Sequence, residues 1–174
     1  MPRLPLICFA LAATLAGQTL ACACTLTKVE IRPLTVENGE TYVGQSGDVE
    51  LKFHNDVQGR AVTVFPEPPL AIHRAQPASD CSIDDGGVWG RDGVWLTPDG
   101  NTLVTTESSG AYQGLVFHDT RSCAKVGEVD VSGSSWNVEG RSIVLKQAAA
   151  PHAKKTLRLD ASCRPPAASA RHKP

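Results

Sequence analysis

The chain has 174 residues, a formal net charge of −1, 20% charged residues and 5% aromatic residues. This length is enough for one hydrophobic core but leaves no room for a second large domain. The near-neutral charge, with no basic stripe, argues against a partner that is nucleic acid or an anionic membrane surface.

The first 23 residues have the three parts of a secretory signal: the basic Arg3, an apolar stretch of about a dozen residues, and a small-x-small cleavage site at Ala21-Cys22-Ala23. The apolar stretch is shorter than the roughly 20 residues that cross a bilayer, and no later stretch is long enough, so no transmembrane segment is predicted. We expect residues 1–23 to be removed and the mature chain to be periplasmic or secreted. A lipid anchor on Cys22 or Cys24 is the alternative, although Leu20 stands one place too late for the usual lipobox.

Cleavage after Ala23 leaves an even number of cysteines, namely Cys24, Cys81, Cys123 and Cys163. In an oxidising compartment this count predicts two disulfides. Four cysteines allow three pairings, and their spacing does not select one of them.

Apolar and polar residues alternate along short segments of the mature chain, which is the pattern of strands with one buried face. The segments are 28–32, 48–53, 61–65, 102–106, 115–117, 126–131 and 156–159. Clusters of Gly, Asn, Asp, Pro and Ser separate them, at 37–39, 98–101 and 132–135. With no helical period, the sequence predicts an all-β fold of about ten short strands. We expect one small domain over residues 24–163 and a disordered tail over residues 164–174.

A shift of about 41 residues aligns three segments, each with an aromatic residue, a glycine, an apolar strand and a cysteine. The segments begin at Phe53, Trp95 and Trp136, and the intervals from glycine to cysteine are 22, 23 and 23 residues. This alignment predicts a structural repeat of about 40 residues.

The second copy carries a family resemblance in three runs: 95–105, 114–121 and 125–129. Together they resemble one blade of a bacterial periplasmic β-propeller of the WD40 or YVTN type, mainly over residues 94–131. The resemblance implies blade-like sheets, with Pro98-Asp99-Gly100 in the turn between the first two strands. Three repeats are fewer than the four blades of the smallest propellers, so an incomplete propeller or an irregular sandwich is expected, with a β-trefoil as the alternative.

No established catalytic signature is present: the sequence has no Gly-x-Ser-x-Gly, no His-Glu-x-x-His, no phosphate loop and no Cys-x-x-Cys. We therefore predict a non-enzymatic domain that uses no cofactor and no metal. The alternative is a periplasmic hydrolase with a composite site of His54, His118 and Asp119, if the fold brings those side chains within hydrogen-bond reach.

The most unusual stretch is the Asp- and Gly-rich segment 80–93. Its acids do not have the spacing of a calcium loop. A surface loop fixed by a disulfide fits an interaction site better, and the residues we expect to contact a partner are Trp89, Arg91 and Asp92. Trp95 and Trp136 occupy equivalent repeat positions and are expected in the core, and the hairpin tip 107–112 is a second place for a binding loop.

The leading functional hypothesis is an exported, non-enzymatic β-domain that binds a protein or a small ligand through its loops. Its more specific form is an inhibitor or immunity protein directed against a toxin or enzyme in the periplasm. A subunit of a larger envelope complex, with an open strand edge facing its neighbour, is a further alternative.

Overall fold

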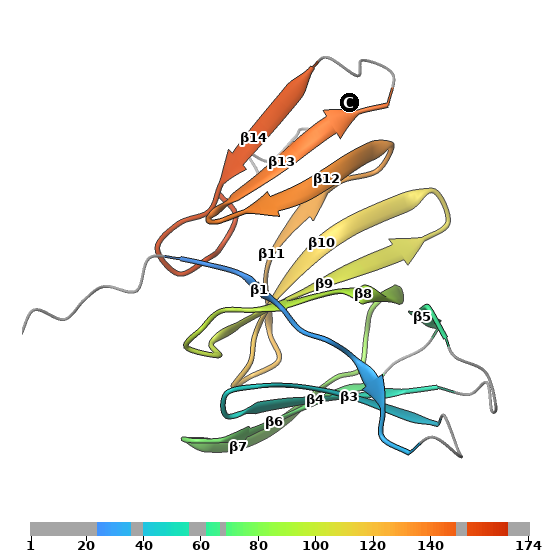
Figure 1. Ribbon diagram of the computed structural model, residues 1–174, viewed down its shortest axis with the longest axis vertical. Coiled ribbons are helices and arrows are strands. Elements are labelled where there is room, and N and C mark those ends of the chain that lie inside the picture. The colour runs from blue at the N-terminus through green and yellow to red at the C-terminus, as the bar shows by residue number, and fades with distance from the viewer. Residues whose placement is uncertain (1–23, 36–39, 56–61, 67–68, 149–152, 167–174) are drawn as a thin grey trace, which may run out of the picture.

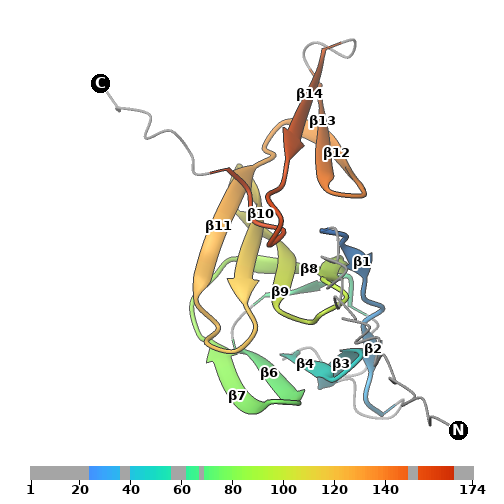
Figure 2. The same cartoon turned by 90° about the vertical axis from the view of Figure 1, so that its left-hand side faces the viewer.

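The structure is a computed structural model that describes residues 24–35, 40–55, 62–66, 69–148 and 153–166. Within these ranges the chain forms 14 β-strands and no helix, so the predicted all-β class is confirmed. The strands lie in three open sheets, here called A, B and C, which stack in layers with sheet A in the middle (Figures 1 and 2). In this part of the chain no helix is long and apolar enough to cross a membrane.

Sheet B is built from antiparallel neighbours in the order β2-β3-β4-β6-β7. Its outer strand β7 pairs with β6 along the full hairpin, from Leu70↔Ile83 to Ala75↔Ala78. The strands are β2 (Arg32–Pro33), β3 (Thr41–Ser46), β4 (Val49–His54), β6 (Leu70–Ala75) and β7 (Ala78–Ile83).

Sheet A has the order β1-β8-β9-β10-β11, with β5 also paired to β8. The pairing of β8 with β9 shifts between Trp89 and Val94, so a bulge interrupts β8 there. The strands are β1 (Thr27–Lys28), β5 (Val64–Phe65), β8 (Val88–Leu96), β9 (Thr102–Ser109), β10 (Tyr112–Asp119) and β11 (Lys125–Asp130).

Sheet C is a three-stranded meander in the order β12-β13-β14. Its bounds are β12 (Ser134–Glu139), β13 (Ser142–Gln147) and β14 (Lys154–Arg158). Ile143 and Leu145 of β13 are buried, whereas Lys146 beside them is exposed, as expected for a sheet with one solvent-exposed face.

The middle sheet separates two hydrophobic cores. Leu103 belongs to the core that sheet A shares with Leu51 and Phe53 of sheet B. The next residue, Val104, belongs to the core shared with Ile143 of sheet C. Because successive side chains of a strand point to opposite faces, β9 contributes to both cores.

Two disulfides tie the layers together. Cys24 pairs with Cys163, 139 residues later, and so joins the first described residues to the chain beyond β14. Cys81 of β7 pairs with Cys123, which lies in the turn between β10 and β11, so sheets A and B converge at this bond. Spacing could not select these pairs because contact between sheets decides them.

Arg74 is a buried charged residue that fastens sheet B to two turns of sheet A. Its Nη1 atom donates to the Gly100 carbonyl at 3.1 Å and to the Thr120 hydroxyl at 3.0 Å. Its Nη2 atom lies 3.4 Å from a carboxylate oxygen of Asp48. The guanidinium therefore holds the 97–101 turn and the turn after β10 against β6.

Within the described residues the three sheets are open, have different numbers of strands and close into neither a propeller nor a barrel, which agrees with the expectation that three repeats are too few for a closed propeller. The predicted repeat also places its aromatic residues unequally. Phe53 lies in the third strand of sheet B, whereas Trp95 is the last residue but one of β8 and Trp136 lies in β12. The segment 28–32 is divided between β1 and β2, and the expected signal segment 1–23 and turn 37–39 lie outside the described residues.

Candidate functional site

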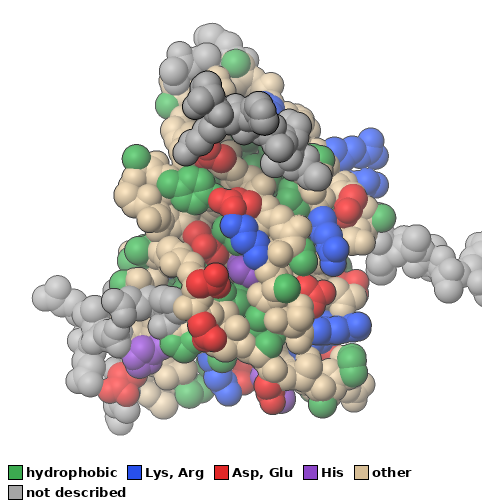
Figure 3. Space-filling view, turned by 180° about the vertical axis from the view of Figure 1, so that it is seen from behind, with side chains coloured by type: hydrophobic (Ala, Val, Ile, Leu, Met, Phe, Trp, Pro, Cys, Tyr) green, Lys and Arg blue, Asp and Glu red, His purple; other side chains and the backbone are tan. Residues whose placement is uncertain are grey.

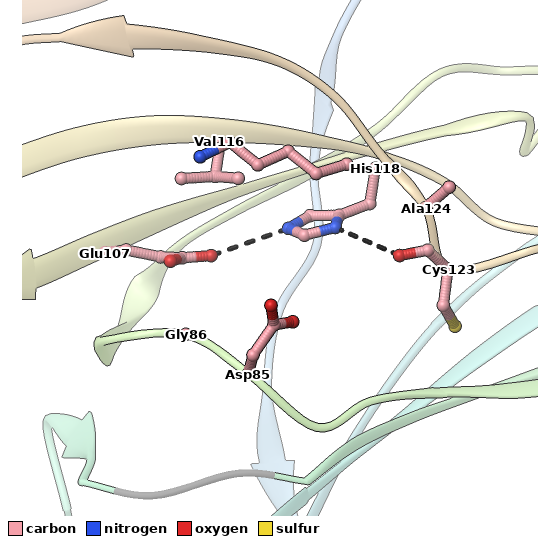
Figure 4. Close-up of a pocket in the computed structure, with 8 residues that line it drawn as sticks. Asp85, Gly86, Glu107, Val116, His118, Cys123 and Ala124 are labelled. Carbon is pink, nitrogen blue, oxygen red and sulfur yellow. Dashed lines mark hydrogen bonds and ion pairs between the residues drawn. The ribbon is translucent and has the colours of Figure 1, made fainter.

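A cavity of about 310 Å³ opens where the loop after β7 faces β9 and β10 of sheet A, beside the Cys81–Cys123 disulfide. Figure 4 shows side chains from these separate elements converging on it. The lining residues are Asp85, Gly86, Glu107, Val116, His118, Cys123, Ala124 and Lys125.

The sheet register places the polar side chains of this cavity on one face. Glu107 of β9 is opposite Gly114 of β10, and His118 of β10 is opposite Leu103 of β9. Leu103, Glu107 and His118 therefore share a face, since positions two and four apart on a strand point the same way. Leu103 packs against sheet B, so His118 and Glu107 also face sheet B, and the cavity lies on this face.

His118 is buried, with 4% of its surface exposed, and both ring nitrogens face acceptors. Nδ1 lies 3.4 Å from the Cys123 carbonyl oxygen, and Nε2 lies 3.5 Å from Oε1 of Glu107. A neutral imidazole has one N–H donor, so only the imidazolium form donates in both directions.

Glu107 is an 8% exposed acid at the inner end of the cavity. It accepts hydrogen bonds from the Thr105 hydroxyl at 3.1 Å and from the Gly87 amide at 3.4 Å. Burial disfavours the ionised carboxyl, but contacts with the His118 ring, the Trp89 indole and the Gly87 amide outweigh it and hold the pKa of Glu107 below its usual range. The cavity therefore contains a carboxylate at neutral pH.

The rim of the cavity adds an exposed acid and a base that is already paired. Asp85 is exposed, and its carboxylate points into the cavity toward His118 (Figure 4). Lys125 forms an ion pair with Glu128 on the same strand. Among the described residues, no group of three or more His, Cys, Asp or Glu side chains is arranged to hold a metal ion.

The residues predicted to contact a partner have three different environments. Trp89 is completely buried and packs edge-on against Phe53, with ring centroids 6.1 Å apart. Arg91 points inward, donates from Nε to the Ile31 carbonyl at 2.9 Å and lies over the Tyr42 ring. Asp92 is exposed.

Trp89 is therefore a core residue. The sequence interpretation had placed its indole on the surface, whereas the structure buries it. The physical reason is the bulge in β8, which turns Trp89 toward sheet B. A partner contact by Arg91 or Asp92 stays a prediction.

The alternative composite site is not assembled by β10. His118 and Asp119 are consecutive in this strand and therefore point to opposite faces. The Asp119 carboxylate accepts from the backbone amides of Arg121 and Ser122, each at 3.1 Å, and thus closes the turn before β11. His118 instead faces Glu107, a residue that sequence reasoning had placed only in a hairpin tip.

Glu107 and His118 could have been found as a pair from one signal. In two strands joined by a short hairpin, the register is fixed by the turn, here at Gly110 with φ of 59°. That register brings two ionisable residues onto a face that also carries the buried apolar residues Leu103 and Val116. Burial of a polar residue on an apolar face is the informative exception in a β-sheet.

A family model described as "Immune protein Tsi1" matches residues 24–163 of this chain. A curated relative, the immune protein Tsi1 of Pseudomonas aeruginosa strain PAO1, is 35% identical over 128 residues, which are 73% of this chain and 74% of the relative. The chain belongs to the Tsi1 immune-protein family. This membership also corrects the resemblance to WD40 and YVTN propellers, which rested on the turn pattern of a single four-stranded meander, β8 to β11.

Proposed function

We propose that this Tsi1-family chain is an immunity protein that acts in the periplasm, where it binds an exported toxin and keeps the toxin inactive. The observation that carries the proposal is the family match over residues 24–163. A non-enzymatic role agrees with the sequence, which has none of the catalytic signatures considered above. Inhibition by binding needs a rigid surface, and layers joined by two disulfides supply one.

Export is supported by two independent features. Residues 1–23 have the pattern of a cleavable secretory signal. Two disulfides are typical of a protein that matures in an oxidising compartment.

The proposal is tested by survival. Each exported toxin of the source bacterium is produced in the periplasm of a test strain, with or without this chain. We expect the full-length chain to restore growth against one toxin, and the purified mature chain to form a complex with that toxin. The matched control lacks residues 1–23, stays in the cytosol, and is expected to give no protection. Absence of both rescue and complex formation for every toxin would refute the proposal.

A further inference from the structure

The Glu107 carboxylate is buried without a permanent cation within the described part of the chain. Its contacts are the Thr105 hydroxyl at 3.1 Å, the Gly87 amide at 3.4 Å, the His118 ring at 3.5 Å and the Trp89 indole. Hydrogen bonds from a cationic N–H donor to a carboxylate are usually about 2.7–2.9 Å long. Buried charges in proteins are normally paired, so this carboxylate has capacity for a further, positively charged donor.

The surroundings of the cavity are acidic as well. Asp85 presents a second carboxylate to the same space, and the one lysine of the lining is already paired with Glu128. Figure 3 views the molecule from behind and shows several acidic side chains along the middle of that face, with a histidine and Lys or Arg side chains among them. The local charge thus favours a cationic ligand although the whole chain is near neutral.

The shape of the cavity suits a charged head on an aliphatic stem. Its volume of about 310 Å³ is at the lower end of the range for small-ligand sites, roughly 300–1,000 Å³. Val116 and Ala124 give the lining an apolar part, against which methylene groups can pack while the charged end reaches the acids.

We infer that this cavity is a binding site for an organic cation of the size of an arginine side chain, a guanidinium or ammonium group held by Glu107 and Asp85. The inference rests on the proposed function only where the cation is a side chain of the bound toxin. The site itself can be tested on the immunity chain alone.

The first experiment titrates agmatine, a guanidinium on a four-carbon stem, into the mature disulfide-bonded chain by calorimetry. We expect saturable binding with a Kd of about 1 mM or tighter, as for a small, well-placed ligand. Butylurea, of similar shape but uncharged, is expected not to bind. In NMR spectra, agmatine should shift the ring resonances of His118, which lines the cavity, and leave those of the exposed His73 unchanged.

Variants then locate the binding. Glu107→Gln should weaken agmatine binding at least tenfold, and Asp85→Asn at least threefold. The matched control is Asp84→Asn, which removes the same charge one residue away, outside the lining, and should change the Kd less than twofold. No saturable binding to the parent chain, or equal binding by parent and Asp85→Asn, would overturn the inference, even if Glu107→Gln failed to fold.

Two outcomes distinguish the source of the cation, and both support the site. If agmatine competes with the toxin and Glu107→Gln weakens the toxin complex at least tenfold, the cation is a side chain of the toxin. If the preformed toxin complex binds agmatine as well as the free chain does, the ligand is a free small molecule. Agmatine binding without any toxin complex would refute the proposed function and leave the site in place.

Discussion

The rings of Trp95 and Trp136 meet edge to face, with their centroids 5.1 Å apart and their planes at 68°. Trp95 lies near the end of β8 in sheet A, and Trp136 lies in β12 of sheet C, so this pair joins two layers of the molecule. Both rings pack against the core that these two sheets share.

The variant Trp136→Ala is therefore expected to destabilise the chain by about 2 kcal/mol. The loss combines apolar surface returned to water with an edge-to-face contact worth about 0.5–1.5 kcal/mol. Equilibrium unfolding in urea measures it. The control Asn137→Ala changes the exposed neighbour on the other face of β12 and should cost less than about 0.5 kcal/mol. Equal effects of the two variants would contradict this account of the contact.

Arg74→Met should destabilise the chain by about 3 kcal/mol or more. The substitution removes the donor that Arg74 gives to the Gly100 carbonyl, the Thr120 hydroxyl and the partly buried Asp48 carboxylate, and leaves the Gly100 carbonyl with the Thr120 hydroxyl alone. Arg32→Met is the control, because Arg32 is exposed and its ion pair in the described part of the chain is with the exposed Glu30, so this variant should unfold close to the parent midpoint. Urea midpoints of the two variants decide the prediction, which would fail if Arg74→Met unfolded at the parent midpoint.

The two disulfides should stabilise the chain to different extents. In the chain-entropy description, closing a loop of 42 residues contributes about 4 kcal/mol, and closing one of 139 residues about 5 kcal/mol. Cys24→Ser/Cys163→Ser should therefore lower the free energy of unfolding by more than Cys81→Ser/Cys123→Ser. Denaturant unfolding of both double variants measures the order. The reverse order would mean that the sheet A–sheet B junction depends on its disulfide for native packing as well.

Acid should weaken the fold partly through Glu107. The pKa of this carboxyl is held below its unfolded value, so its contribution to stability is present above about pH 4.5 and is lost as the pH falls through the folded pKa. We therefore compare the free energy of unfolding at about pH 5 and about pH 3, on either side of the unfolded pKa. The decrease between these two pH values should be smaller in Glu107→Gln than in the parent. Glu139→Gln, at an exposed position of β12, serves as control. A parent-like acid slope in Glu107→Gln would contradict the prediction.

Alternation predicted the strands whose two faces differ. The segment 48–53 corresponds to β4, because one side of this strand packs on a core and the other side is more exposed. The segment 102–106 lies within β9, although both faces of that strand are buried. The turn at 98–101 is also where the sequence placed it. These features depend only on neighbours in the chain.

The sequence did not predict strand β8, because this strand forms by pairing with β9 and its own residues do not have a strand pattern. Gly90, Arg91, Asp92 and Gly93 read as a loop, yet they lie within a strand of nine residues. A Cβ at Gly93 would overlap the Thr106 side chain of β9, so the glycine permits the close approach of the two strands. The burial of Trp89 and the meeting of His118 with Glu107 follow from this long-range pairing, which no short window of sequence contains.

The nested order of the disulfides affects how a translocated chain can mature. A chain that is translocated with its N-terminus first presents Cys24 before Cys81, but these two thiols belong to different native disulfides. Oxidation in order of appearance would join Cys24 to Cys81 and then Cys123 to Cys163, and would trap the three layers in a wrong connection. The native pattern forms if Cys24 stays reduced until Cys163 has been translocated, or if an exchange catalyst rearranges the early disulfide. Production of this chain is therefore expected to depend on disulfide isomerase activity in the compartment that receives it.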